Sequence, residues 1–198
     1  MRVVVSEFIS LDGVVQAPGG PEEDTDGAFA HGGWSHPYFD PEVVGGAFAS
    51  GLERAEALLY GRRTYLTMAG AWPERAADPF ADRLNAMKKY VVTDTLGDAE
   101  LTWNNTERIP GSEAVARIRE LRAAPGGDLA MMGSPTLVRA LLGAGLVDEL
   151  QLVQMPVLLG GGKSIFPEDG VKRPLELVST TAAKTGAQVS VYRAAERG

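Results

Sequence analysis

Short apolar runs alternate with longer stretches of mixed polarity along most of this chain. Such runs are typical of buried strands. They fall at residues 2–9, 57–60, 89–92, 128–132 and from 149 onward. The stretches between them have the spacing and the terminal residues of helices. They predict helices at 40–57, 62–68, 79–88, 112–122 and 136–143. Strands and helices that alternate in this way form mainly parallel sheets with both faces covered.

The C-terminal region follows another pattern. LELVSTTAA and AQVSVYRA alternate in polarity around a turn near residues 184–186, which predicts an antiparallel hairpin. No helix is predicted after residue 143 to cover this hairpin. Its edge also carries few charged residues that would oppose pairing with another chain. Self-association about a two-fold axis would cover that edge, and a twisted edge strand on a monomer is the alternative. We expect one α/β domain over residues 1–198, and a homodimer.

The composition excludes several classes of protein and of site. Of the 198 residues 44% are hydrophobic, so the chain can bury a core. No apolar run approaches the ~20 residues of a membrane helix. The chain has no cysteine, which excludes disulfides, thiolate metal sites and thiol nucleophiles. The formal net charge is −7, and the basic residues are scattered singly. We therefore expect no nucleic-acid partner, no membrane and, without a signal peptide, a cytoplasmic location.

The residues that follow each strand are the first candidates for a site, because ligands of such sheets bind beyond the carboxyl ends of the strands. The strand 57–60 runs through Gly61-Arg62-Arg63-Thr64 directly into a helix. Glycine permits close approach of a ligand, the free amides of a first helical turn favour an anion, and arginine can fork onto a phosphate. A strand–helix turn with solvated arginines is an alternative of equal weight.

Two further strand ends carry suitable residues. Thr93 offers a hydroxyl to a ribose phosphate, although Asp94 beside it would repel one, so a merely polar strand end is the alternative. Gly133-Ser134 leads straight into a helix whose N-terminus favours a pyrophosphate. LLGGGKSIF at 158–166 lacks the first glycine of a P-loop, and the Rossmann fingerprint is absent too.

The segment 17–40 is a long loop rich in glycine, proline and aspartate. Loops of that length are usually functional or flexible. Its Trp34 either stacks on a flat ligand or pins the loop to the core. His31 and His36 have no carboxylate at ligand spacing, so we expect no metal site. Asp40 is a plausible N-cap for the helix that follows.

The order of these pieces carries more information than any one of them. ISLDGVV, LLYGRRTY, KYVVTDT, MMGSPTLVRALLGAGLVDELQL and PVLLGGGKSIFP follow one another over roughly residues 3–167. In this order they resemble the dihydrofolate reductase superfold, and most of all the C-terminal reductase domain of the riboflavin-pathway deaminase–reductase. The resemblance implies a three-layer α/β/α fold with a mixed, mainly parallel sheet, NADPH as cofactor, and a dimer formed through the C-terminal region.

The resemblance also implies roles for the matching residues. Arg62 would face the 2′-phosphate of NADPH and Thr64 the pyrophosphate, and the peptide between Gly133 and Ser134 would be cis. The cofactor contacts of the family fall on Phe8, Val14, Val15, Gly61, Arg62, Arg63, Thr64, Thr93, Gly133, Ser134, Thr136 and Leu137.

The substrate side departs from the riboflavin-pathway reductases. Their lysine after SLDG and their glutamate before the glycine pair are Val14 and Met132 in this chain. Asp40 or Glu42, near the start of the first helix, are the candidates to relay a proton, and Trp34 is the candidate to stack on the substrate ring.

We therefore expect an NADPH-dependent reductase of a flat heterocycle, of the pterin or aminopyrimidine type found in folate or riboflavin pathways. Two alternatives stay open. One is a true dihydrofolate reductase, and the other is a dinucleotide- or drug-binding protein without turnover.

Overall fold

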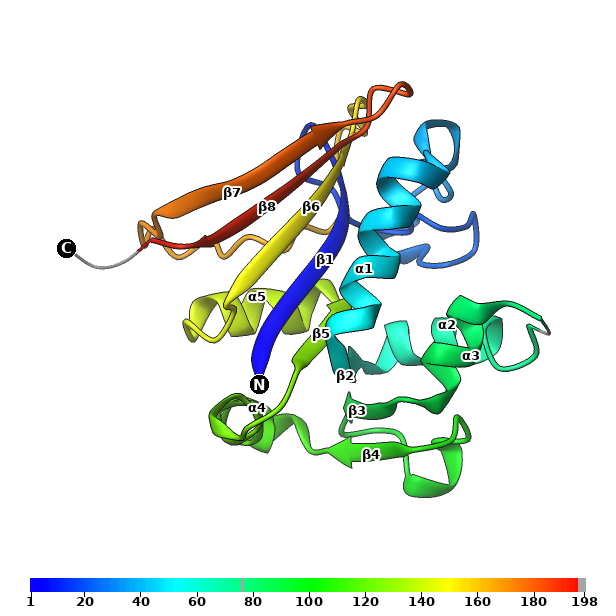
Figure 1. The fold of residues 1–198 in the computed structure, drawn as a ribbon, viewed down its shortest axis with the longest axis vertical. Helices are drawn as coiled ribbons and strands as arrows, with labels where there is room; N and C mark the ends of the chain where they lie inside the picture. Colours follow the sequence, from blue (N-terminus) through cyan, green and yellow to red (C-terminus); the bar gives the residue numbers. More distant parts are fainter. Residues whose placement is uncertain (76, 196–198) are drawn as a thin grey trace.

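One sheet of eight strands runs through the computed structural model, which describes residues 1–75 and 77–195 (Figure 1). The strands are β1 (Arg2–Ser10), β2 (Ala55–Gly61), β3 (Lys88–Val92), β4 (Thr106–Ile109), β5 (Asp128–Met132), β6 (Glu149–Met155), β7 (Leu175–Ala182) and β8 (Gln188–Ala194). Their order is β4-β3-β2-β5-β1-β6-β8-β7. Neighbours from β4 to β6 are parallel, and β8 is antiparallel to both β6 and β7. The predicted mixed sheet with its C-terminal hairpin is confirmed.

Helices cover both faces of this sheet (Figure 1). They are α1 (Gly46–Arg54), α2 (Arg62–Ala71), α3 (Pro79–Ala86), α4 (Ala114–Ala123) and α5 (Pro135–Gly143). Consecutive residues of a strand point to opposite faces. Leu59 of β2 packs in one core with α4 and α5, and Leu58 packs in another with α1, α2 and α3. None of the described helices is long and apolar enough to cross a membrane.

The helix predicted over 40–57 is shorter than expected. Asp40 caps a π-helical turn, Pro41–Gly45, by accepting hydrogen bonds from the amides of Glu42 (3.0 Å) and Val43 (2.8 Å), which confirms the predicted N-cap. The chain then forms α1 and becomes strand at Ala55. Pairing with β5 decides the conformation of this segment, because sheet pairing overrides a weak local helix preference.

The short strand β4 is absent from the sequence-based prediction. Its residues, TERI, have no alternating or continuous apolar pattern, and it lies at the outer edge of the sheet beside β3. Only the parallel partner defines it as a strand, and that information is not local in the sequence.

Candidate functional site

A cleft of about 1390 Å³ lies above the central strands and is lined by the ends of β2 and β5, the first turns of α2 and α5, and part of the loop 17–40. Most of the predicted cofactor residues line it, namely Phe8, Val15, Gly61, Arg62, Arg63, Thr64, Gly133, Ser134, Thr136 and Leu137. The rest of its wall is largely apolar, with Phe39, Phe48, Met68, Trp72 and Phe80 among its members. A flat, partly apolar ligand fits such a wall.

The two predicted phosphate-binding turns meet in this cleft. The amide of Gly61 donates a hydrogen bond of 2.7 Å to Ser134 Oγ, although the two residues are 73 positions apart. A Cβ added to Gly133 would stand 3.0 Å from Thr64 Cγ2. The N-terminal ends of α2 and α5 therefore converge on one surface, where their free amides favour an anion.

The Gly133–Ser134 turn differs from the expectation in one respect. No cis peptide bond occurs among the described residues, so the expected cis bond at this pair is wrong. The chain instead turns from β5 into α5 through two successive left-handed residues, with φ of 82° at Gly133 and 72° at Ser134. This conformation brings Ser134 Oγ to the amide of Gly61, so the two turns stay in register.

Arg62 and Arg63 have different environments. Arg62 is exposed, lines the cleft and makes no ion pair within the described residues. Arg63 is paired with Asp24 (2.9 Å) and with Asp26. Its hydrogen bond holds the pKa of Asp26 down to about 2, with help from Lys163. Arg62 is therefore the arginine that is available to a phosphate.

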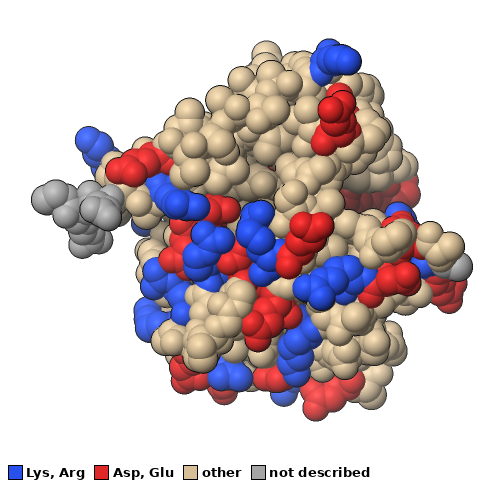
Figure 2. Space-filling view, viewed as in Figure 1, with Lys and Arg blue, Asp and Glu red and all other residues tan. Residues whose placement is uncertain are grey.

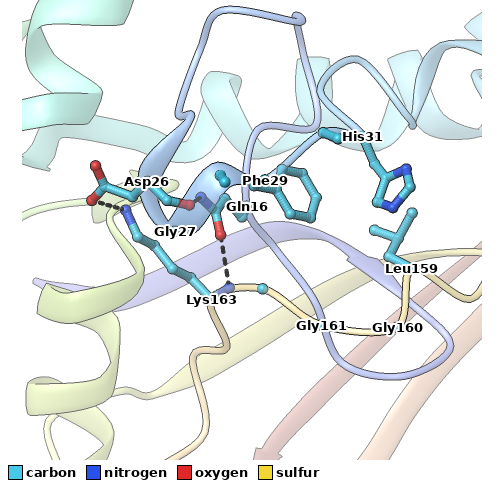
Figure 3. A pocket seen from close by; sticks show the side chains of 12 residues that line it. Gln16, Asp26, Gly27, Phe29, His31, Leu159, Gly160, Gly161 and Lys163 are labelled. Atoms are coloured by element: carbon cyan, nitrogen blue, oxygen red, sulfur yellow. Dashed lines mark hydrogen bonds and ion pairs between the residues drawn. The ribbon is translucent and has the colours of Figure 1, made fainter.

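An acidic latch, formed by Asp24 and Asp26, ties the loop 17–40 across the mouth of the cleft. Arg63 of α2 donates to both carboxylates. Lys163 donates to both as well, at 2.9 Å to Asp26. Figure 3 shows Lys163 reaching Asp26 while its backbone amide donates to Gln16 Oε1 at 3.1 Å. The latch thus joins the loop to both a cleft helix and the glycine-rich segment 158–163, around a smaller pocket of about 530 Å³.

The SLDG motif has a structural role beside the site. Asp12 accepts hydrogen bonds from Ser10 Oγ (2.5 Å) and from the amides of Leu159 (3.1 Å) and Gly160 (2.7 Å). The bond from Ser10 and those from the backbone lower the pKa of Asp12 to about 2. These amides of the glycine-rich segment are therefore occupied by a side chain of the protein.

Trp34 is a core residue, so its predicted contact with a substrate ring is wrong. Only 7% of it is exposed, it packs with Val44 and Met155, and its Nε1 donates a hydrogen bond of 2.7 Å to the carbonyl of Gln16. It does not line the cleft. A buried indole with a satisfied N–H pins the loop and leaves nothing to offer a ligand.

The two residues predicted to relay a proton also lie outside the cleft. Neither Asp40 nor Glu42 lines the cleft; the first is committed to its helix cap, and the second is exposed. Thr93 and Val14 are the two expected cofactor residues outside the cleft. Thr93 Oγ1 accepts from the amides of Thr95 (3.2 Å) and Leu96 (3.1 Å), and Val14 is buried.

Glu7 is a buried acidic residue of the cleft that the sequence pattern did not indicate as a site residue. It lies in the middle of β1, lines the cleft and is 4% exposed, and its Oε1 has no hydrogen-bond partner in the described part of the chain. Burial, reinforced by Glu23, raises its pKa to about 8. A lone carboxylate in a valine-rich strand was the available signal, since such a residue is rarely buried without a purpose.

Nearly the whole chain is similar to known proteins. The model of the RibD C-terminal domain family matches residues 1–189. The uncharacterized protein YyaP of Bacillus subtilis (strain 168) is 24% identical over 196 residues, which cover 96% of this chain and 94% of that protein.

Three solved structures are similar to this one. A putative riboflavin biosynthesis protein from Shewanella sp. PV-4 has a TM-score of 0.74 at 20% identity, covering 99% of this chain and 100% of that one. A pyrimidine reductase-like protein from Corynebacterium diphtheriae has a TM-score of 0.68 at 15% identity, covering 99% and 92%. Dihydrofolate reductase from Enterococcus faecalis, complexed with NADP(H), has a TM-score of 0.61 at 15% identity, covering 98% and 97%. At these identities the likeness is one of fold.

Proposed function

The chain belongs to the RibD C-terminal domain family and has the dihydrofolate reductase-like fold, and we propose that it is an NADPH-dependent reductase of a flat heterocycle. The substrate class is a pterin or an aminopyrimidine. The observation that carries the proposal is the convergence of the Gly61–Thr64 and Gly133–Ser134 turns in one large, mainly apolar cleft.

The residues of the cleft fit a phosphorylated dinucleotide. The free amides of the first turn of α2 and the hydroxyl of Thr64 would hold the pyrophosphate against Gly133. Arg62, exposed at the rim, would hold the 2′-phosphate. NADPH supplies the hydride, and the protein contributes position, electrostatics and the exclusion of water. Phe8 and Val15 would lie beside the nicotinamide, with the ring of Phe8 tilted by 35° against that of Phe48 at 5.1 Å between centroids.

Arg62→Ala is expected to weaken NADPH binding about tenfold or more and to leave NADH binding nearly unchanged. A charge-assisted hydrogen bond to a phosphate contributes ~1.5–3 kcal/mol, and only NADPH has the 2′-phosphate. Titration of both cofactors, followed by fluorescence or calorimetry, gives the ratio.

Arg63→Ala is the matched control for this experiment, because it removes the same charge from the next residue, which already pairs with the acidic latch. Any loss of affinity in the Arg63→Ala variant should be equal for NADPH and NADH. Equal losses of NADPH and NADH affinity in the Arg62 variant would refute the assignment of Arg62 to the 2′-phosphate.

We also propose that the protein is a homodimer formed through the β7–β8 hairpin. β7 is the edge strand, every residue of it is exposed, and it carries Leu175, Leu177 and Val178 at 46%, 55% and 48% exposure. The surface over this part of the molecule is mostly uncharged, whereas the lower half carries both signs densely (Figure 2). An apolar patch on an unpaired edge is a surface that a second copy would cover.

Leu177→Lys is expected to convert the dimer to a monomer. Light scattering at micromolar concentration should give twice 21.0 kDa for the wild-type chain and 21.0 kDa for the variant. Point substitution is preferable to truncation, because β8 pairs with β6 and its removal would uncover the sheet. Leu66→Lys, at an exposed leucine on α2 (44%), is the control that should remain dimeric. A wild-type mass near 21.0 kDa would defeat the proposal.

A further inference from the structure

Glu7 lines the cleft at the level of the Gly133–Ser134 turn. Ser6 is the register partner of Met132 in β5, so Glu7 stands one residue further along, at the level of Gly133. On its other side Glu7 pairs with Leu152 of β6. Its side chain shares the face of β1 that carries Val5 and Ile9, which is the face covered by α5. A carboxyl group therefore lies in the floor of the cleft, beside the turn proposed to hold the pyrophosphate.

The carboxyl group of Glu7 has no counter-ion among residues 1–75 and 77–195. The charged residues that line the same cleft are Glu22, Glu23, Asp24, Asp26, Arg62, Arg63 and Lys163. The cations among them make no ion pair with Glu7 in the described part of the chain: Arg63 and Lys163 are held by the acidic latch. The acid that acts on Glu7 is Glu23, whose Oε2 accepts a hydrogen bond of 2.6 Å from the amide of Gly19. The sheet neighbours of Glu7 are uncharged.

These surroundings keep the carboxyl group neutral near pH 7. Burial disfavours the charged form, and the repulsion by Glu23 adds to it. A neutral carboxyl group has one O–H donor and one carbonyl acceptor side by side. The acceptor or donor at Oε1 is unused in this structure, and leaving such a buried group unpaired is costly. A ligand group with one acceptor and one donor in matching positions would satisfy both.

We propose that Glu7 is a ligand-recognition residue that pairs, as a carboxylic acid, edge to edge with a planar cis-amide group, in which N–H and C=O point the same way. The Glu7 O–H donates to the ligand carbonyl, and the Glu7 carbonyl accepts from the ligand N–H. An ionised carboxylate cannot make the first of these bonds. This mode differs from an ion pair with a protonated heterocycle, which needs the opposite charge state of the acid.

Two ligands of the proposed function carry a cis-amide edge. One is the carboxamide of the nicotinamide, and the other is the lactam of a uracil- or pterin-type ring. The inference rests on the proposed function for this choice of ligands, and the probes below separate the two sources. NADPH and its reduced 3-acetylpyridine analogue, which has a methyl ketone in place of the carboxamide, test the cofactor. 6-Aminouracil and 6-amino-1,3-dimethyluracil, which has lost its ring N–H groups, test the substrate ring.

The experiment measures the affinity of wild-type, Glu7→Gln and Glu7→Leu proteins for the four probes at about pH 7 and about pH 9.5. In the wild type, ionisation of Glu7 should weaken binding of an intact amide edge about 30-fold between these values, because the higher pH lies about 1.5 units above the pKa of about 8. Glu7→Gln keeps one donor and one acceptor and cannot ionise, so it should bind within about threefold of wild type at pH 7 and lose affinity at the higher pH only as far as the probe itself ionises. Glu7→Leu should bind about tenfold or more weakly at pH 7.

The probes that lack the amide edge should bind the wild-type and Glu7→Leu proteins alike. The informative quantity is the pH-dependent loss in wild type beyond that in Glu7→Gln. An excess loss confined to NADPH supports the proposal and assigns the edge to the cofactor carboxamide; an excess loss confined to 6-aminouracil supports it and assigns the edge to the substrate ring. Identical pH profiles in wild type and Glu7→Gln, with all three proteins folded by circular dichroism, would overturn it. If NADPH binds no variant, the proposed function fails, and the 6-aminouracil pair still decides the role of Glu7. If the wild-type protein binds no probe with an amide edge, both proposals are wrong.

Discussion

Gly133→Val is expected to abolish NADPH binding. Gly133 has a φ of 82°, and a Cβ there would stand 3.0 Å from Thr64 Cγ2 and 3.3 Å from Thr64 Oγ1. A valine would therefore fill the space where the two turns meet and displace the hydroxyl proposed to contact the pyrophosphate. Calorimetric titration should show no detectable binding where the wild-type protein binds.

The same substitution also strains the backbone, so the experiment needs a control for folding. A branched side chain in the left-handed region costs on the order of 1–3 kcal/mol. Gly145→Val is the matched control, because Gly145 follows the end of α5 with a φ of 66° and a Cβ there would meet nothing within 4 Å. Both variants carry the same kind of backbone strain, but only the Gly133 variant should lose the cofactor. A folded Gly133→Val protein that titrates normally with NADPH would exclude the cleft as the pyrophosphate site.

The second large effect is a pH dependence of stability that originates at Glu7. Its pKa rises from 4.5 to about 8 on folding, so the folded state binds the proton more tightly than the unfolded chain does. The resulting contribution to the free energy of unfolding is complete below pH 4.5 and is lost as the pH rises toward and through 8. Between about pH 5 and about pH 8 the loss amounts to roughly 3 kcal/mol, at 1.36 kcal/mol for each unit of pKa.

Glu7→Gln should remove this slope, and urea denaturation at both pH values measures it. The stability of the two proteins is compared only up to pH 8, because a second buried group, Lys89, contributes above that pH. Burial lowers the pKa of Lys89 to about 8, so its contribution to stability has the opposite sign and grows above that pH. Glu23, whose pKa burial also raises, contributes in the same direction as Glu7 and remains in both proteins. Parallel curves for wild type and Glu7→Gln would show that Glu7 ionises normally in the folded protein.

Most of the sheet could be predicted because most of its strands have a recognisable local sequence pattern. The apolar runs at β1, β2, β5 and β6 and the hairpin composition each identify a strand, and the helix between two strands dictates parallel pairing. β4 could not be predicted, because TERI is a strand only through its partner β3. The strand character of Ala55 likewise depends on pairing with β5 rather than on its own sequence.

The meeting of the two turns proposed to bind the cofactor was predictable for a similar reason. A glycine at the end of a strand, with a hydroxyl residue just before the following helix or in its first turn, marks Gly133–Ser134 and Gly61–Thr64 in the sequence, and the parallel sheet places such turns at one edge. The substrate side was not predictable. Trp34 belongs to the core because its indole finds a carbonyl across the loop, and Glu7 stands out only once its burial without a partner is known.

Steady-state oxidation of NADPH, followed by the loss of its nicotinamide absorbance, with a panel of pterins, dihydrofolate and aminopyrimidine ribosides, decides whether the protein is a reductase. We expect the wild-type protein to accelerate oxidation with at least one of these heterocycles and to prefer NADPH to NADH. The acceleration should be lost in the Gly133→Val variant but not in Gly145→Val. Acceleration by dihydrofolate alone would identify a true dihydrofolate reductase. No acceleration with any acceptor, in a wild-type protein that binds NADPH, would contradict the reductase proposal and leave a dinucleotide-binding protein without turnover.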